Sequence, residues 1–277
     1  MRIHNLSHPY PQQSTGMNLK QPIIPFLKRY SRWLMPVSLI LAVLFWKGLV
    51  VWRGYPAFIL PPPEMVWQRL VLSLSDGSLL RHSAFTLLEV LLGLFAGGII
   101  ASITGYFLAK SPVLENVLAP YLIASQAVPV VAIAPLLIIW FGSGLASKVL
   151  ICSLIVFFPV LVNTVLGFRA VPDHLRDLMH SMHATPAQML RYLEIPSALP
   201  VLLGGLRIGA TLSVIGAVVG ELVGADKGLG FLINVGRGQY DTALVFVAIG
   251  ALIVMAVSLY GCVVLLERYF LRWQRKL

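Results

Sequence analysis

The polar side chains whose types and spacing could support chemistry are concentrated in one stretch, RDLMHSMHATPAQMLRYLEIP at residues 176–196. His180 and His183 lie three residues apart, a separation at which two imidazoles on one helix face can approach the same metal ion. No carboxylate or third ligand stands at a recognisable spacing from them, and the sequence has no H-E-x-x-H motif. We therefore interpret the two histidines as solvated or interface residues and expect no metal site.

Covalent and nucleotide chemistry are not indicated either. Cys152 and Cys262 stand inside apolar segments without C-x-x-C spacing, so neither a disulfide nor a metal role is expected. The glycine-rich GADKGLG at residues 224–230 lacks the Ser/Thr and the spacing of a phosphate-binding loop. We find no pairing of a nucleophile with a base and expect no catalytic residue. With no cofactor bound by this chain, energy for any work must come from a partner or an ion gradient.

The composition indicates the solvent in which these residues work. Hydrophobic residues make up 58% of the chain and charged residues 12%, whereas a soluble globular protein is about a quarter charged. The mean hydropathy is +0.84. The formal net charge of +10 raises the question of nucleic acid. However, the basic residues flank apolar segments and do not form a patch with interleaved aromatics. This distribution is typical of a membrane protein, so we expect no nucleic-acid partner.

Six segments are apolar over the roughly 20 residues that a spanning helix needs. They lie at about residues 34–52, 84–109, 119–141, 148–168, 198–222 and 243–266. Placing both termini in the cytoplasm puts the larger share of Lys and Arg on inner connections, as membrane proteins prefer. We therefore predict one membrane domain over residues 34–268, a disordered cytoplasmic tail over 1–33 and a basic cytoplasmic tail over 269–277.

Two connections between the spans carry amphipathic patterns. In the outer one, a run of prolines is followed by apolar residues at helical spacing as far as Leu74, which predicts a helix at the outer interface. At residues 172–196, Pro172 suits a first helical turn and Thr185 suits an N-cap before Pro186, so two short helices should project from the membrane. Their apolar faces either lie on the bilayer or their own bundle, or form a docking surface for a cytoplasmic protein.

Prolines and polar residues inside the spans are candidates for the lining of a solute path. Pro129 and Pro135 are expected to break span three twice, and the freed carbonyls must be satisfied by protein or by a water-lined cavity. Gln126, Asn163 and Glu221 are the polar residues that could contact cargo. The alternatives are interhelical hydrogen bonds for the two amides and, for the carboxylate, snorkelling to the outer interface.

Span five also carries a stripe of small residues, Gly205, Gly209, Gly216 and Gly220. Small residues on one face let helix backbones approach closely, so we expect these glycines to pack against neighbouring helices. A helix that slides or rotates against its neighbours would use the same stripe. Arg207, near the inner end of this span, has lipid phosphates, Asp177 and Glu194 as candidate partners.

The loop at residues 172–196 resembles the EAA loop of type I ABC importer permeases, whose pattern is E-A-A, three residues, Gly, nine residues, I-x-L-P. Asp177-Leu178-Met179, His183 and Leu193-Glu194-Ile195-Pro196 fall at the matching spacing. The resemblance runs from about residue 60 to 266 and is greatest with the nitrate/sulfonate/taurine branch, which also includes pyrimidine and riboflavin permeases. By this resemblance, the ATPase-coupling loop contains Asp177, Leu178, Met179, Met182, His183, Ala184, Leu193 and Pro196.

The resemblance implies an all-α membrane protein with six transmembrane helices, the type I ABC importer fold, and cytoplasmic coupling helices between spans four and five. It implies four partners: a cytoplasmic ABC ATPase dimer carrying ATP and Mg, a second permease copy in a homodimer, an extracytoplasmic solute-binding protein, and the lipid of a bacterial inner membrane. The motif departs from its pattern, with Asp for Glu, Leu-Met for Ala-Ala, and His183 for Gly. Gly there permits a tight turn, and His is among the few other residues that tolerate positive φ.

We therefore expect the permease subunit of an ATP-driven importer. A gradient-driven secondary transporter is the alternative, but it would need carboxylates near mid-membrane and repeated halves with broken helices, and the sequence has neither. The cargo stays open among sulfonate, nitrate, taurine, pyrimidine and riboflavin-like solutes. Glu89, where many sulfonate-type relatives carry a basic residue, favours an organic or heterocyclic cargo.

Overall fold

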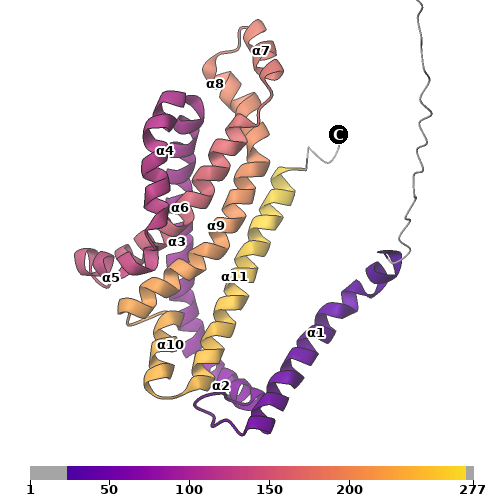
Figure 1. Ribbon diagram of the computed structural model, residues 1–277, viewed down its shortest axis with the longest axis vertical. Coiled ribbons are helices and arrows are strands. Elements are labelled where there is room, and N and C mark those ends of the chain that lie inside the picture. Colours follow the sequence, from indigo (N-terminus) through magenta and orange to yellow (C-terminus); the bar gives the residue numbers. More distant parts are fainter. Residues whose placement is uncertain (1–23, 273–277) are drawn as a thin grey trace, which may run out of the picture. The chain divides into compact units, whose positions relative to one another are not determined.

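A computed structural model describes residues 24–272, with side chains from residue 36 onward. These residues form helices joined by short connections and contain no β-strand (Figure 1). The chain divides into two compact units, Met1–Trp52 and Arg53–Leu277, which we describe separately.

In the described part of the first unit, residues 24–52 form one helix, α1 (Ile24–Arg53), whose last residue already belongs to the second unit. Its Pro36–Arg53 portion is long and apolar enough to cross a membrane and covers the first expected span. Because the helix begins at Ile24, residues 24–33 are helical, and their assignment to a disordered tail was wrong. The rest of that tail, residues 1–23, lies outside the described residues, as does the end of the predicted basic tail at 273–277.

Counting α1, five helices of the described chain are long and apolar enough to span a membrane. The other four are α3 (Ser78–Lys110), α6 (Leu145–Arg169), a continuous helix Pro186–Gly224 that includes α9 (Ile195–Gly224), and α11 (Thr242–Phe270). A sixth span is possible only as a bent pair, made of α4 (Pro112–Ala127) and α5 (Val130–Phe141). The prediction of apolar spanning helices is confirmed, but the third of them is not straight.

The expected third span, 119–141, is bent by 91° between α4 and α5. The break lies at Val128, whose backbone is extended at φ −83° and ψ 116°. A residue before proline avoids the helical conformation because the proline ring crowds it, so Pro129 explains the bend. The predicted second break, at Pro135, was wrong because α5 continues through this residue.

Helix α6 of the second unit packs closely against both α3 and α9. A Cβ atom on Gly97 of α3 would lie 2.6 Å from the carbonyl oxygen of Ser153 on α6. On the other side, a Cβ on Gly216 of α9 would lie 2.8 Å from the Cα of Cys152. Only glycine allows backbones this close, so these positions set how near the three helices approach.

The two ends of this bundle carry different short helices (Figure 1). The end that we call the α10 end holds α2 (Pro63–Ser75) and α10 (Leu229–Gly238). The predicted helix after the prolines is thus confirmed as α2. Val66 and Leu70 on one side of α2 pack against a buried cluster that includes Leu229 of α10.

The opposite end, the α7 end, holds α7 (Asp173–Ser181) and α8 (Pro186–Met189). The first predicted helix of the loop is confirmed, since α7 begins directly after Pro172. The second was expected to be a separate short helix, and this was wrong. α8 continues through a π-helical turn, η1 (Leu190–Glu194), into α9, so it is the first turn of the 186–224 helix.

Candidate functional site

Helix α7 exposes an apolar surface at the end of the bundle. The side chains of Leu178 and Met182 are 55% and 70% exposed, whereas Leu175 and Met179 on the same helix are half-buried. Asp177 is exposed beside them. An apolar pair left open on a short helix is the kind of surface that another protein covers.

The turn between α7 and α8 takes the conformation that the sequence pattern requires. His183 occupies the position of the motif glycine and has φ 55°, in the left-handed region that this residue type tolerates. The Ala184 amide donates to the carbonyl of Met179 at 3.0 Å and closes the end of α7. Thr185 and Gln188 then form a capping box, which confirms the predicted N-cap.

Two side-chain contacts and the continuous helix 186–224 tie this loop to the spanning helices. The Arg176 guanidinium donates to the carbonyl oxygen of Phe168, at the end of α6, at 2.8 Å. Lys110 Nζ, at the end of α3, lies 2.5 Å from the buried carboxylate of Glu194. Leu193 and Pro196 are half-buried where the 186–224 helix enters the bundle. The loop is therefore connected to α3, α6 and α9 together.

Arg207 does not make the contacts proposed for it from the sequence. Its guanidinium pairs with the carboxylate of Glu267 on α11, while Glu194 pairs with Lys110. Asp177 is exposed at the surface of α7. Arg207 therefore links α9 to α11 and does not link α9 to the loop.

The five residues proposed for a solute path do not come together. Gln126, Pro129 and Pro135 are exposed on α4, at the bend and on α5. Asn163 donates to the carbonyl of Pro159 at 2.8 Å on its own helix and packs against the backbone of α9. Glu221 is completely buried. Their role in transport stays a prediction.

The glycine stripe of span five faces α6. A Cβ on Gly205 would lie 2.6 Å from that of Asn163, and a Cβ on Gly209 would lie 3.2 Å from a methyl group of Val156. Further along, Gly216 faces the backbone of α6 and Gly220 faces a side chain of α6. The stripe therefore lies at a tight helix contact.

A buried polar cluster occupies the α10 end of the bundle. His82, Thr86 and Glu89 follow one another at i, i+4 and i+7 on a single face of α3, and all three are buried. Lys148 Nζ of α6 lies 3.3 Å from the carboxylate of Glu89. Thr86 donates to the carboxylate of Glu221 on α9 at 2.6 Å.

This cluster was not predicted from the sequence. Lys148 is the first residue of the fourth predicted span, whereas α6 already begins at Leu145 and the lysine side chain is only 5% exposed. Glu89 and Glu221 were considered singly. The spacing of His82, Thr86 and Glu89 was the available signal, because three polar residues at helical spacing in an apolar span must share one buried face.

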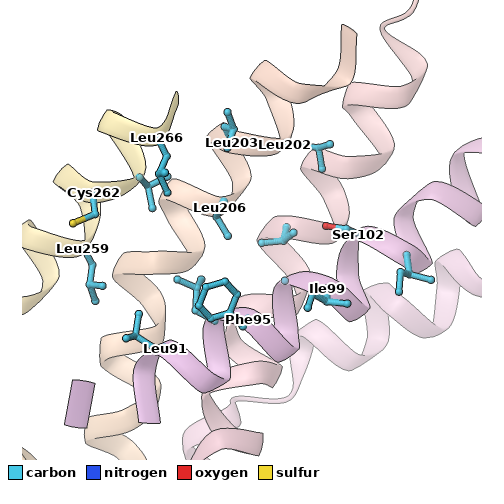
Figure 2. Close-up of a pocket in the computed structure, with 15 residues that line it drawn as sticks. Leu91, Phe95, Ile99, Ser102, Leu202, Leu203, Leu206, Leu259, Cys262 and Leu266 are labelled. Carbon is cyan, nitrogen blue, oxygen red and sulfur yellow. The ribbon is translucent and has the colours of Figure 1, made fainter. Parts of the chain in front are cut away.

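A cavity of about 470 Å³ opens between α3, α9 and α11 (Figure 2). Leu91, Phe95, Leu206 and Leu259 are among its apolar lining, and Ser102 supplies one hydroxyl. None of the proposed path residues lines it. The cavity thus offers no set of polar groups that would orient a charged solute.

Comparison with known proteins gives the family. Residues 90–272 match the model of the family described as "Binding-protein-dependent transport system inner membrane component". The riboflavin transport system permease protein RibX of Chloroflexus aurantiacus is 47% identical over 266 residues, covering 95% of this chain and 99% of that protein. The formylaminopyrimidine transport permease protein ThiX of Halalkalibacterium halodurans is 34% identical, with 82% and 93% covered. For the taurine transport system permease protein TauC of Escherichia coli the identity is 32%, with 79% and 82% covered.

Solved structures agree with the fold. A chain of the MetNI methionine ABC transporter, solved in inward-facing conformations, superposes with a TM-score of 0.62 at 20% identity, covering 71% of this chain and 97% of that one. At this identity the likeness shows the fold alone. The fold class and the family resemblance predicted from the sequence are confirmed, and a gradient-driven transporter is not favoured. This chain belongs to the binding-protein-dependent transport system inner membrane components and is the membrane-spanning permease subunit of an ABC importer.

Proposed function

We propose that a partner ATPase drives this permease by docking on α7. The observation that carries the proposal is the exposure of Leu178 on α7 and of Met182 directly after it, 55% and 70%. Fully burying one such side chain contributes about 1.5–3 kcal/mol, so covering these two would supply part of the energy of docking. ATP and Mg belong to that partner, and this chain carries out no hydrolysis itself.

Movement of α7 would reach three spanning helices at once. Arg176 attaches α7 to the last turn of α6, and the 2.5 Å Lys110–Glu194 pair attaches the start of the 186–224 helix to α3. A rigid connection of this kind converts a displacement at the docking surface into a displacement of the spans, which is how domain closure is transmitted elsewhere.

The orientation follows from the same assignment. The α7 end faces the cytoplasm together with both termini, and the α10 end faces outward toward a solute-binding protein. Two copies of the chain pair around one path, each with its own ATPase. The distribution of Lys and Arg between the connections supports this orientation.

The cargo that we propose is riboflavin or a similar flavin-like heterocycle. Support comes from the 47% identity with a riboflavin permease along almost the whole of both chains, against 34% and 32% for the pyrimidine and taurine permeases.

Two experiments test these assignments separately. The tagged chain is purified in mild detergent, and co-purifying proteins are identified by mass spectrometry; a stoichiometric ATPase supports docking, and its absence under several detergents contradicts it. Uptake of radiolabelled riboflavin is then measured in riboflavin-requiring cells that express the chain with its ATPase and binding protein. Uptake that unlabelled riboflavin inhibits and excess taurine does not is expected. No uptake of riboflavin, together with uptake of radiolabelled taurine in the same cells, would move the cargo to the sulfonates.

A further inference from the structure

The first turn of α10 receives its hydrogen-bond partners from other helices. Three consecutive amides each donate to a buried side chain, Gly228 to His82 Nδ1 at 3.0 Å, Leu229 to Thr86 Oγ1 at 2.8 Å and Gly230 to Glu221 Oε2 at 2.6 Å. The amides at the start of a helix have no partners within the helix and usually bond to a nearby Ser, Thr or Asp. Here the N-cap residue is Gly228, which has no side chain, so α3 and α9 supply the partners instead.

Thr86 and Glu221 form one connected hydrogen-bond system. The Thr86 hydroxyl accepts from Leu229 and donates to Glu221 at 2.6 Å. The Glu221 carboxylate therefore accepts from a hydroxyl and from an amide, and it lies at the start of a helix, where a negative charge is favourable. Lys148 and Glu89 lie beside it as an ion pair inside the bundle.

The backbone of α10 is shaped to let the carboxylate in. Gly228 has φ +108°, and a Cβ there would lie 2.1 Å from Glu221 Oε1. A Cβ on Gly230 would lie 2.7 Å from the Cβ of Glu221. The contact between α10 and the Glu221 carboxylate therefore requires glycine at both positions. This requirement explains the Gly-Leu-Gly sequence at residues 228–230, which does not belong to a phosphate-binding loop.

The other end of α10 is fixed as well. Asp241, just after α10, pairs with Arg69 of α2 at 2.8 Å and also caps α11 by accepting from the Leu244 amide at 3.0 Å. Thr242 donates to the carbonyl of Phe58 at 2.5 Å. α10 is thus attached to α3 and α9 at its start and to α2 at its end.

We propose that His82, Thr86 and Glu221 are positioning residues that cap α10 from α3 and α9, so that α10 moves with these two spanning helices as one body. Glu221 acts through α10 and does not contact cargo. The last step of the proposal rests on the proposed function: at the outward end, this coupling would carry movement of α3 and α9 to the surface that meets the binding protein.

Hydrogen exchange measured by mass spectrometry on the full chain in lipid nanodiscs tests the cap without any partner. Thr86→Val keeps the size of the side chain but removes its hydroxyl, and it should raise amide exchange in residues 228–238 about tenfold relative to the wild type. Thr86→Ser should restore protection. Thr164→Val is the matched control, because Thr164 is equally buried but bonds only to the carbonyl of Val160 on its own helix.

The outcomes separate the cap from ordinary packing. Selective exchange in residues 228–238 for Thr86→Val, but not for Thr164→Val, supports the proposal. Unchanged exchange in that segment, or equal loosening of the whole chain by both variants, overturns it. Glu221→Gln provides a second check and should also raise exchange in residues 228–238, since Thr86 and Gly230 donate to different oxygens of the carboxylate and Gln has an NH2 group in place of one of them.

A functional measurement tests the last step. With the ATPase and binding protein reconstituted, Thr86→Val should raise the concentration of binding protein that half-maximally stimulates ATP hydrolysis, and Thr86→Ser should restore it. Basal hydrolysis without binding protein should be unchanged. If Thr86→Val raises amide exchange but leaves the half-maximal concentration of binding protein at the wild-type value, the cap holds α10 in place and the proposed link to the binding protein is overturned. Failure of docking on α7 would instead abolish all ATPase activity bound to the permease, so the two failures are distinguishable.

Discussion

The ammonium group of Lys110 lies 2.5 Å from the carboxylate of Glu194, and this contact joins the end of α3 to the π-helical turn before α9. The glutamate side chain is 1% exposed, whereas that of the lysine is 42% exposed. A buried carboxylate needs a cation or several donors to remain charged. The contact therefore fixes the start of the 186–224 helix against α3, at the place where the coupling loop enters the bundle.

Removing the cation should reveal this dependence. Lys110→Met should lower the free energy of unfolding by about 1–3 kcal/mol, because Glu194 stays buried without its partner; the exposure of the lysine keeps the loss below that of a fully buried pair. Thermal unfolding in detergent measures the change. Adding Glu194→Gln to Lys110→Met should recover part of the stability, since a neutral amide needs no cation. Equal stability of Lys110→Met and the wild type would show that the contact contributes nothing.

Introducing a negative charge at Leu178 or Met182 tests whether the partner ATPase docks on α7. Leu178→Asp and Met182→Asp should each reduce the affinity for the partner ATPase at least about tenfold, because each replaces apolar burial with a desolvated carboxylate. Co-purification of the ATPase with the tagged permease measures the effect. Both side chains are exposed, so the permease itself should keep its yield and unfolding temperature. Leu178→Met is the matched control, and undiminished co-purification with both Asp variants would contradict docking on α7.

His183 stands where the family pattern has glycine, and its φ of 55° makes a backbone prediction. His183→Val should destabilise the protein by about 1–2 kcal/mol, because a β-branched residue is strained in the left-handed region. His183→Gly should be neutral or slightly stabilising, since glycine accepts this conformation freely. Unfolding temperatures of the two variants measure the difference. If both variants match the wild type, the turn rearranges easily and does not constrain α7.

Local rules of helix chemistry explain which parts of this loop the sequence predicts. Pro172 and Thr185 act on their immediate neighbours, so the starts of α7 and α8 follow from a few residues. The continuation of α8 into α9 does not follow in this way. Leu190–Glu194 forms a π-helical turn whose glutamate is paired with Lys110 from a helix 84 residues earlier, so tertiary contact keeps the segment helical.

The difference between local and long-range determinants also explains why the polar cluster at the α10 end was not predicted. The bend at Val128–Pro129 is a property of two adjacent residues and can be predicted. The Thr86–Glu221 hydrogen bond joins residues 135 positions apart, and its geometry depends on how α3 and α9 pack. A sequence marks both residues as unusual for a span, but only the packing shows that they face each other and not the lipid or a path.

Close packing of α9 against α6 gives the last prediction, which compares two glycines in one helix. A Cβ on Gly216 would meet the Cα of Cys152 at 2.8 Å, whereas one on Gly204 would meet nothing within 4 Å. Gly204→Ala should stabilise α9 by up to about 1 kcal/mol through helix propensity alone. Gly216→Ala gains the same propensity but forces two backbones apart, and it should be less stable than Gly204→Ala by about 1–3 kcal/mol. Unfolding temperature and riboflavin uptake are measured for both variants. The helix propensity of alanine is the same in both variants and cancels in the comparison. Equal stability of the two variants would therefore mean that α6 and α9 do not pack at this distance in the membrane. A loss of uptake in Gly216→Ala alone would place the contact in the moving part of the transporter.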